Sequence, residues 1–524
     1  MYIRLPLPCC RSKRKTLKMN TYVIFLTFLI SHVYARDGDS CFADEDDPYL
    51  YMATKTAYHF VHAGKTRFQD VPNCHAEQIW MFATHGTRCP SETEDIEMQK
   101  LTELQNLIIS NHEVRNNGRM CIRDLENLKR WKPDGYLAIE RAEVLTPQGV
   151  EDMRLLARRL QSNFPQLLQP IDENITAENY VFKTTDARES SMSYFMEGLF
   201  GDRQAVDAEE VAINDTLLTM YKSCNMWNNG PSNTTIEEVI MFEEGAQFKN
   251  LIQNVSQSLG FLYDISKESI LTMYNMCRYE KAWTVTKLSP WCAVFSKEEL
   301  RVLEYREDLY YYYKAGYGRE INAQLGCTLL QDMMNHFWRV EQNGESNEPK
   351  GIFYFGDIIS LQNLLTTLNI NKDQTQLTAF NYKDMAKRHW RTSFMSSFAA
   401  NLVAVFYRCD ITSQPNKIMF YLAEKLVMLD GCDVGLCDWE YFKQKFNPML
   451  KHCDLNVCWN GSGATTYAIN FFLILLSCFS LVFIRNTHLH SIKCQTEEYN
   501  CSEYIITAGN NASSRIIYTF LGYG

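Results

Sequence analysis

The chain has 524 residues, of which 46% are hydrophobic and 22% are charged, and these proportions exclude a disordered, collagen-like or multi-span membrane protein. Its 52 Lys and Arg residues against 62 Asp and Glu residues give a formal net charge of −10, which argues against general nucleic-acid binding because that function needs a basic surface. An anionic substrate would therefore have to be met by a local cluster of cations.

The N-terminus has the pattern of a secretory signal peptide. Basic residues between Arg4 and Lys18 precede a largely apolar run, Tyr22–Ala35, that ends on a small residue. We predict a signal peptide over residues 1–35. An uncleaved signal anchor is the alternative, although the apolar run is short for a membrane span. Either form places the following chain in the secretory pathway, as an ectodomain at the cell surface or on the lumenal side of a membrane.

The body of the chain, residues 36–463, carries features typical of that compartment. Five Asn-x-Ser/Thr sequons predict N-glycosylation, and thirteen cysteines predict disulfides with one cysteine left over. Cys277 and Cys292 are a plausible local pair, whereas the other pairings cannot be deduced from the sequence. The four cysteines between residues 432 and 458 have spacings that could suggest a zinc knuckle, but we expect bridges there. The sequons lie at Asn174, Asn214, Asn233, Asn254 and Asn460.

Three segments of the body share one pattern, in which a short apolar run stops at polar residues and leads into helix-like periodicity. In an open α/β sheet, ligands bind beyond the carboxyl ends of parallel strands, so neighbouring strands would bring these polar ends together. The segments are Ile79–Ala83 before Thr84–Pro90, Tyr180–Phe182 before Lys183–Thr185, and Ile352–Phe355 before Gly356 and Asp357. The residues that could share one pocket are His85, Arg88, Arg188 and Asp357.

His85 and Arg88 have side chains suited to phosphate chemistry. A neutral imidazole can act as a nucleophile, and a guanidinium can donate two parallel hydrogen bonds to phosphate oxygens. Gly86 lies between them and allows the close backbone approach that a ligand-binding turn requires. A His-Gly pair in a loop is nevertheless more often structural, and an arginine on a helix is more often a solvated surface charge, so these residues alone leave the function open.

Near the C-terminus, residues 464–484 form an uncharged apolar run. At 1.5 Å per residue this run is long enough to cross a hydrocarbon core of about 30 Å, which predicts a single transmembrane segment. A lipid-anchor signal is the alternative, because Asn460–Gly463 offers small residues ahead of the run. That alternative lacks a polar spacer and does not explain the tail, residues 485–524, which carries no recognisable module.

The segment Thr84–Pro90 reads Thr-His-Gly-Thr-Arg-Cys-Pro and resembles the Arg-His-Gly-x-Arg-x-Pro signature of the histidine acid phosphatases. Over about residues 48–460 the chain resembles one branch of them, the multiple inositol polyphosphate phosphatases. The supporting stretches are Ala53–Thr56, Leu145–Gly149, Ser289–Cys292, Lys314–Gly318, Leu377–Asn381 and the Cys-rich segment around Cys453.

The resemblance implies an α/β fold with a central, mostly parallel sheet flanked by helices, built from about residues 48–204 and 346–460. It further implies a smaller, mainly helical cap from about residues 205–345. The family reaction is hydrolysis of phosphate monoesters on inositol polyphosphates through a phosphohistidine, with no metal or other cofactor. The expected ligands are inositol polyphosphates or other phosphate monoesters, and no protein partner is identified.

Three residues match the working residues of the family. His85 matches the nucleophile, Arg88 the second arginine of the signature, and Arg188 the phosphate-binding arginine on the helix after the second strand. Lys55 and Lys183 are candidates for contacts to outer phosphates.

Three other family residues are replaced. Thr84 stands where the family has its first arginine, and the family pattern Phe-Gly-His-Ala-Glu reads Phe-Gly-Asp-Ile-Ile here. Asp357 therefore replaces a phosphate-binding histidine, and Ile359 replaces the glutamate that protonates the leaving oxygen. A positioned general acid is worth about 10²–10⁴ in rate, and each charge-assisted hydrogen bond to phosphate is worth about 1.5–3 kcal/mol. We predict that the family reaction is lost or strongly impaired, which would make the protein a pseudoenzyme.

Two other interpretations stay open. Asp357 could remain protonated beside a bound anion and donate in place of Ile359, which would make the chain a residually active acid phosphatase. Alternatively, the ectodomain keeps the fold in order to hold an anion or a protein partner.

Overall fold

The structure is a computed structural model, and the residues that it describes all belong to the unit Met1–Trp459. The predicted signal peptide 1–35, the apolar run 464–484 and the tail 485–524 lie outside the described residues. Within the described part of the chain, every helix is too short or too polar to cross a membrane. The described residues are 41, 48–62, 68–169, 175–185, 191–201, 209–212, 215–229, 233–343, 348–410, 413–451, 453 and 455–459.

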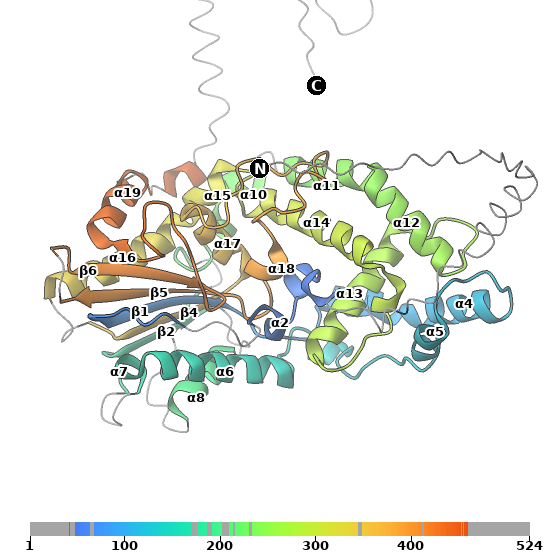
Figure 1. Cartoon of the computed structure of the whole chain (residues 1–524), viewed down its shortest axis with the longest axis horizontal. Helices are drawn as coiled ribbons and strands as arrows, with labels where there is room; N and C mark the ends of the chain where they lie inside the picture. Colours follow the sequence, from blue (N-terminus) through green and yellow to red (C-terminus); the bar gives the residue numbers. More distant parts are fainter. Residues whose placement is uncertain are drawn as a thin grey trace, which may run out of the picture. The chain divides into compact units, whose positions relative to one another are not determined.

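An eight-stranded sheet lies at the centre of this unit, in the order β3-β2-β4-β1-β5-β6-β7, with β8 paired to β6 (Figure 1). Together with its flanking helices, the sheet confirms the predicted α/β class. The strands are β1 (Cys74–Thr84), β2 (Tyr180–Thr184), β3 (Glu209–Glu210), β4 (Gly351–Gly356), β5 (Asn401–Cys409), β6 (Asn416–Leu422), β7 (Lys425–Leu426) and β8 (Cys437–Asp438).

The sheet is mixed rather than mostly parallel. Parallel pairs join β3, β2, β4 and β1, whereas β1–β5, β5–β6, β6–β7 and β6–β8 are antiparallel pairs. The prediction of a mostly parallel sheet is therefore wrong for the half that contains β5–β8. The physical reason is the connection between β5 and β6, residues 410–415, which is long enough for a hairpin but too short for the crossover that parallel strands need.

Helices cover both faces of the sheet, so the central strands are apolar on both sides. On β1, Ile79 and Met81 pack into the cluster on one face, and Trp80 and Phe82 pack into the larger cluster on the other. Figure 1 shows α6, α7 and α8 on one side of the sheet and α16, α17 and α19 on the other. These helices are α6 (Pro147–Asn163), α7 (Pro165–Leu168), α8 (Ser191–Phe200), α16 (Cys327–Asn343), α17 (Ile358–Thr367) and α19 (Trp439–Lys451).

A second group of helices lies beside the sheet (Figure 1). Two of them, α3 and α14, begin with a Ser-x-x-Glu capping box, Ser91 with Glu94 and Ser296 with Glu299, in which each partner satisfies a free amide of the other. The group comprises α3 (Glu92–Gln99), α4 (Leu101–Glu113), α5 (Ile122–Lys129), α11 (Asn233–Glu243), α12 (Ala246–Ser258), α13 (Lys267–Trp283) and α14 (Lys297–Lys314).

Short helices connect these two groups. They are η2 (Pro48–Leu50), η3 (Ala53–Lys55), α2 (Tyr58–His62), η4 (Ile139–Arg141), α9 (Met220–Ser223), α10 (Asn225–Asn229), η6 (Cys292–Val294), α15 (Glu320–Leu325), α18 (Thr392–Met395) and η8 (Leu455–Cys458).

Six disulfides stabilise the described unit, and Cys89 is a buried free cysteine. The local bridge Cys277–Cys292 is confirmed. The four cysteines between residues 432 and 458 also form bridges, as predicted, and are not a zinc knuckle. The other five pairs are Cys41–Cys121, Cys74–Cys409, Cys224–Cys458, Cys327–Cys453 and Cys432–Cys437.

Candidate functional site

The carboxyl ends of the parallel strands β1, β4 and β2 lie next to one another on the same side of the sheet, where the strands end. Thr84, the last residue of β1, is paired with Gly356, the last residue of β4, and Thr184 at the end of β2 is paired with Phe355. The loops that follow β1 and β4 therefore begin next to each other. This brings His85 and Asp357 to the same ends of the strands, as their positions in the sequence predict. Arg188 lies outside the described residues.

The turn after β1 is packed tightly against the start of α6. A Cβ atom on Gly86 would lie 2.7 Å from the carbonyl oxygen of Gly149, and a Cβ atom on Gly149 would lie 2.1 Å from the carbonyl oxygen of Thr87. Thr146, the N-cap of α6, donates from its amide and its hydroxyl to the same Thr87 carbonyl, at 3.0 Å each. Both glycines are needed because any side chain would separate the turn from the helix.

His85 lies between the end of β1 and this turn, with its ring oriented by the backbone. Its Nδ1 lies 3.0 Å from the carbonyl oxygen of Gly86, and because a carbonyl can only accept, Nδ1 carries the hydrogen and Nε2 keeps its lone pair. Burial lowers the pKa of His85 well below its usual value, and the positive charges of Arg88 and Lys55 lower it further, against the Gly86 hydrogen bond. The imidazole is therefore neutral, which is the form that can attack phosphorus.

The two described cations that act on His85 are each paired with a carboxylate. Arg88 Nη2 lies 3.2 Å from Glu143 Oε1, and Lys55 Nζ lies 3.5 Å from Glu94 Oε1. Burial alone would raise the pKa of Glu94, but Lys55 and the hydrogen bonds that Glu94 accepts lower it to about 2. An anionic ligand at this site therefore has to compete with carboxylates that already hold the cations.

Asp357 begins α17 and uses its carboxylate as a structural acceptor. Its Oδ1 accepts the amide hydrogen of Ser360 at 3.0 Å, which makes Asp357 the N-cap of the helix. Its Oδ2 accepts from the hydroxyl of Tyr221 and lies 3.8 Å from Lys222 Nζ. Burial and the neighbouring charge of Asp357 raise the pKa of Tyr221, so the phenol stays protonated and donates.

Ile359, two residues later, packs against a small apolar cluster that contains Met220, Trp227 and the Cys224–Cys458 disulfide. Ile359 occupies the position of an acid in the resembled family, and here it contributes to a hydrophobic contact between α17 and the α9–α10 segment.

Thr84 also makes structural contacts. It is 2% exposed, and its amide and its hydroxyl both donate to the carbonyl oxygen of Ala400, at 2.8 and 3.3 Å. Its hydroxyl is therefore held by the residue directly before β5.

The two candidate lysines lie in different surroundings. Lys55, in η3, contributes to the electrostatic environment of His85 and lies 5.7 Å from the centre of the Tyr279 ring. Lys183, within β2, is paired with Glu209 of the edge strand β3 at 2.9 Å. Of the five sequons, Asn254 is exposed on α12, Asn233 begins α11, and Asn174, Asn214 and Asn460 lie outside the described residues.

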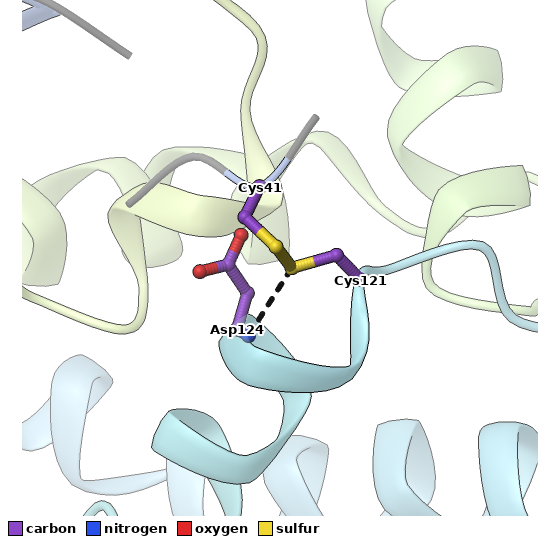
Figure 2. A group of neighbouring side chains, drawn as sticks. All are labelled: Cys41, Cys121 and Asp124. Atoms are coloured by element: carbon purple, nitrogen blue, oxygen red, sulfur yellow. Dashed lines mark hydrogen bonds between the residues drawn. A yellow bond between two sulfur atoms is a disulfide. The ribbon is translucent and has the colours of Figure 1, made fainter. Parts of the chain in front are cut away.

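Within the described residues, one group of potential metal ligands comes together, and its chemistry does not suit a metal. Cys41, Cys121 and Asp124 have ligand atoms within 4.8 Å of one another (Figure 2). The two sulfurs form a disulfide, so neither is a thiolate. The amide of Asp124 donates to Cys121 Sγ at 3.4 Å, so this bridge caps the start of α5.

Sequence reasoning missed several residues of this site. Tyr221 and Lys222 reach Asp357 from more than a hundred residues away, and no local pattern links the two segments. Glu143 faces Arg88 because residues 88 and 145 form an antiparallel bridge. The N-cap role of Asp357 was not predicted either, although an Asp directly before an apolar-periodic run is a recognisable helix start.

The comparisons with known proteins agree with the resemblance seen in the signature. The family profile of the histidine phosphatase superfamily (branch 2) matches residues 77–422. The chain is similar to multiple inositol polyphosphate phosphatase 1 of Drosophila melanogaster, with 35% identity over 432 residues that cover 81% of this chain and 91% of the relative. The human protein of the same name is 28% identical over 433 residues, which cover 77% of this chain and 87% of that protein.

Two solved structures have a similar fold. The phytase from D. castellii superimposes with a TM-score of 0.60 at 16% identity, over 82% of this chain and 93% of the phytase. The apo form of the multiple inositol polyphosphate phosphatase of Bifidobacterium longum gives a TM-score of 0.56 at 14% identity, over 73% of this chain and 94% of that protein.

Proposed function

The chain belongs to branch 2 of the histidine phosphatase superfamily, and from this we propose that it binds inositol polyphosphates or related phosphate monoesters around His85 but hydrolyses them poorly or not at all. The ligand class follows from the names of its relatives, which are phosphatases of multiple inositol polyphosphates. His85 and Arg88, which match the nucleophile and an arginine of the signature, are the groups that would touch the phosphate, with Arg188 as the third.

The observation that carries this proposal is that the residues after β4 already make structural contacts in place of the family's proton donor. A general acid must hold a hydrogen that it can give to the leaving oxygen. Ile359 has none and packs into an apolar cluster. Asp357 accepts from Ser360 on one carboxylate oxygen and from Tyr221 on the other. Losing a positioned acid alone costs about 10²–10⁴ in rate, and an alkoxide leaves poorly without a proton.

The alternative is a residually active acid phosphatase in which Asp357 supplies the proton. Its side chain is 30% exposed at the edge where the parallel strands end, which supports access to a ligand. To act as donor, Asp357 would have to give up the Tyr221 hydrogen bond or the Ser360 cap, and acidic conditions would favour that exchange. This form of the protein would depend on Asp357 as well as on His85.

We also propose that the protein is a glycosylated protein of the secretory pathway. Six disulfides support an oxidising compartment, and the exposed side chain of Asn254 on α12 is accessible for a glycan. Treatment of the secreted protein with a peptide-N-glycosidase should increase its electrophoretic mobility, and unchanged mobility would contradict the proposal.

The proposed function is tested by two measurements on the same purified protein. Phosphate release from inositol hexakisphosphate between pH 4 and 8 should equal that of His85→Ala, and calorimetric titration should detect saturable binding. Arg88→Ala should weaken the binding. Arg154→Ala, which removes a partly exposed arginine of α6 that is paired with Glu197 of α8, serves as the matched control. Release above the His85→Ala level that Asp357→Asn abolishes would instead establish the alternative.

A further inference from the structure

A pocket lies on the part of the sheet that contains the antiparallel strands. It is open, has a volume of about 990 Å³, and is formed by the end of α17 with the following loop, by residues around α18, by the β6–β7 hairpin with its continuation to Asp430, and by Lys445 of α19. Neither His85, Arg88 nor Asp357 lines it. The pocket is therefore separate from the site at the ends of β1 and β4.

Part of the wall of this pocket is apolar, and polar or charged side chains make up the rest of the lining. Leu368, Leu422, Val427 and Leu429 are each at most 9% exposed and line it. Met428, which is 63% exposed, adds an apolar side chain that is open to solvent. This surface offers an apolar ligand a place to leave water, which is the largest favourable contribution to the binding of small molecules.

Three lysines line the same pocket, and they differ from the cations near His85. Among the described residues, no carboxylate oxygen lies within 4.0 Å of the ammonium nitrogen of Lys372, Lys425 or Lys445. Lys372 donates to the Asn369 side chain at 3.3 Å, and Lys445 donates to the backbone carbonyl of Asp430 at 2.8 Å. Lys55 and Arg88, by contrast, each face a glutamate.

Lys425 is partly buried and lies near an aromatic ring. Its ammonium nitrogen lies 5.6 Å from the centre of the Phe394 ring, a residue that also lines the pocket. Burial lowers the pKa of Lys425 from its usual value, which means that its charge is poorly solvated. A bound anion would restore the stabilisation that water does not provide there.

The other charged residues of the pocket are largely committed to internal contacts. Asp373 accepts the backbone amides of His389 and Trp390, at 2.7 and 3.0 Å. Arg391 is paired with Glu304 at 2.7 Å. Arg388 is buried against Glu304 and Asp308. The side chain of Asp430 is the remaining acid of the lining, against three lysines.

We propose that this pocket binds a small amphiphilic anion, with an apolar chain packed on the leucine-lined wall and one acidic group beside Lys425 and Lys445. A highly charged, fully polar ligand would leave the apolar wall unused, and an uncharged apolar ligand would leave the lysines without counter-ions. The pocket is independent of the proposed function of the His85 site, so either can fail without the other.

The test uses dodecanoate as the probe, because a carboxylate cannot be mistaken for a phosphate substrate. Calorimetric titration of the full chain should show saturable binding that is unchanged by saturating inositol hexakisphosphate. The double substitution Lys425→Gln and Lys445→Gln should raise the dissociation constant at least about tenfold. A second double substitution, Lys132→Gln and Lys249→Gln, removes two exposed lysines outside the pocket and should change nothing.

A chain-length series on the unmodified protein keeps the proposal testable if the double variant does not fold. Affinity should rise from octanoate to decanoate to dodecanoate, because each added methylene buries more apolar surface. The proposal is overturned if dodecanoate does not bind at about 1 mM, if acetate binds as well as dodecanoate, if the double variant binds normally, or if inositol hexakisphosphate displaces the probe.

Discussion

The loops after β1 and after β4 begin side by side at one edge of the sheet, but their polar residues are used differently. After β1, the turn at Gly86 leaves one ring nitrogen of His85 free, and Arg88 is held by a single exposed glutamate. After β4, Asp357 caps a helix and accepts from Tyr221, while Ile359 packs against the small apolar cluster that contains Met220 and Trp227. The first loop keeps groups that can act on a ligand, and the second has become part of the scaffold.

The comparison shows that the two residues after β4 meet needs of the fold at positions where the resembled family has working residues. A helix start needs a cap, and Asp meets that need as well as any residue. Ile359 gains apolar contacts where an ionised glutamate would lose solvation. The two replacements on which we base the proposed loss of catalysis therefore also satisfy local structural requirements of α17.

Restoring the family residues should produce the largest change. The triple substitution Thr84→Arg, Asp357→His and Ile359→Glu returns a phosphate clamp and a proton donor, so phosphate release from inositol hexakisphosphate should rise by about 10²–10⁴. Adding His85→Ala to the triple variant should remove the gain. A triple variant that melts like the wild type but releases no more phosphate would mean that the two loops do not form one active site.

Removing Arg88 should have the next largest effect. Arg88→Ala deletes a charge-assisted contact worth about 1.5–3 kcal/mol, so the dissociation constant for inositol hexakisphosphate should rise about 10- to 150-fold. Calorimetric titration measures the change, with Arg154→Ala as the control. Equal affinities of the two variants would place the ligand elsewhere.

The neutral state of His85 predicts a pH effect on folding. Its pKa is lowered in the folded protein, so below about pH 6.5 the unfolded chain takes up a proton that the folded chain refuses, and stability falls by up to about 1.4 kcal/mol per pH unit. His85→Gln should therefore lose less stability between pH 6.5 and 5, by about 1–2 kcal/mol. Urea unfolding at both pH values checks this, and equal losses of stability in the two proteins would contradict a neutral His85 imidazole in the folded state.

The cap role of Asp357 predicts a smaller, selective effect. Asp357→Ala should cost about 1 kcal/mol of stability, whereas Asp357→Asn should cost little, because Asn is an equally good N-cap. Thermal unfolding distinguishes the two variants. If both lose the same stability, the contacts with Tyr221 and Lys222 depend on the charge and outweigh the cap.

The smallest expected effect concerns Glu143, whose carboxylate is paired with Arg88. The backbone of Glu143 has a φ of 63°. Glu143→Gln keeps the size of the side chain but removes the competing charge, and exposed ion pairs are worth about 0.2–1 kcal/mol. Affinity for inositol hexakisphosphate should therefore increase about 1.5- to 5-fold. Glu197→Gln, at the Arg154 pair, should leave it unchanged. A decrease in affinity would mean that Glu143 positions Arg88 for the ligand.

Local patterns in the sequence predict the strand ends well. The apolar runs at Ile79–Ala83 and Ile352–Phe355 are strands, and their polar ends meet because parallel strands present their carboxyl ends at one edge. The antiparallel half of the sheet is not predicted, because the order of β5 and β6 depends on which strands pair across the sheet, which periodicity does not encode.

Long-range contacts explain the rest of the site. Tyr221 contacts Asp357 because α9 packs against α17, and the Cys224–Cys458 bridge joins segments that are 234 residues apart. Such pairs depend on the folded topology and leave no spacing that a reader of the sequence could use. The sequence therefore shows only that Asp357 and Ile359 replace family residues. The structure adds the contacts of these two residues, which support the proposed loss of catalysis.

The most direct test is a simultaneous measurement of bound and hydrolysed inositol hexakisphosphate by the wild type, His85→Ala and Asp357→Asn at pH 5. We predict that the wild type binds the ligand saturably and releases no more phosphate than His85→Ala. Phosphate release that exceeds the His85→Ala level and disappears in Asp357→Asn would contradict the account, because Asp357 would then be a proton donor and not only a helix cap.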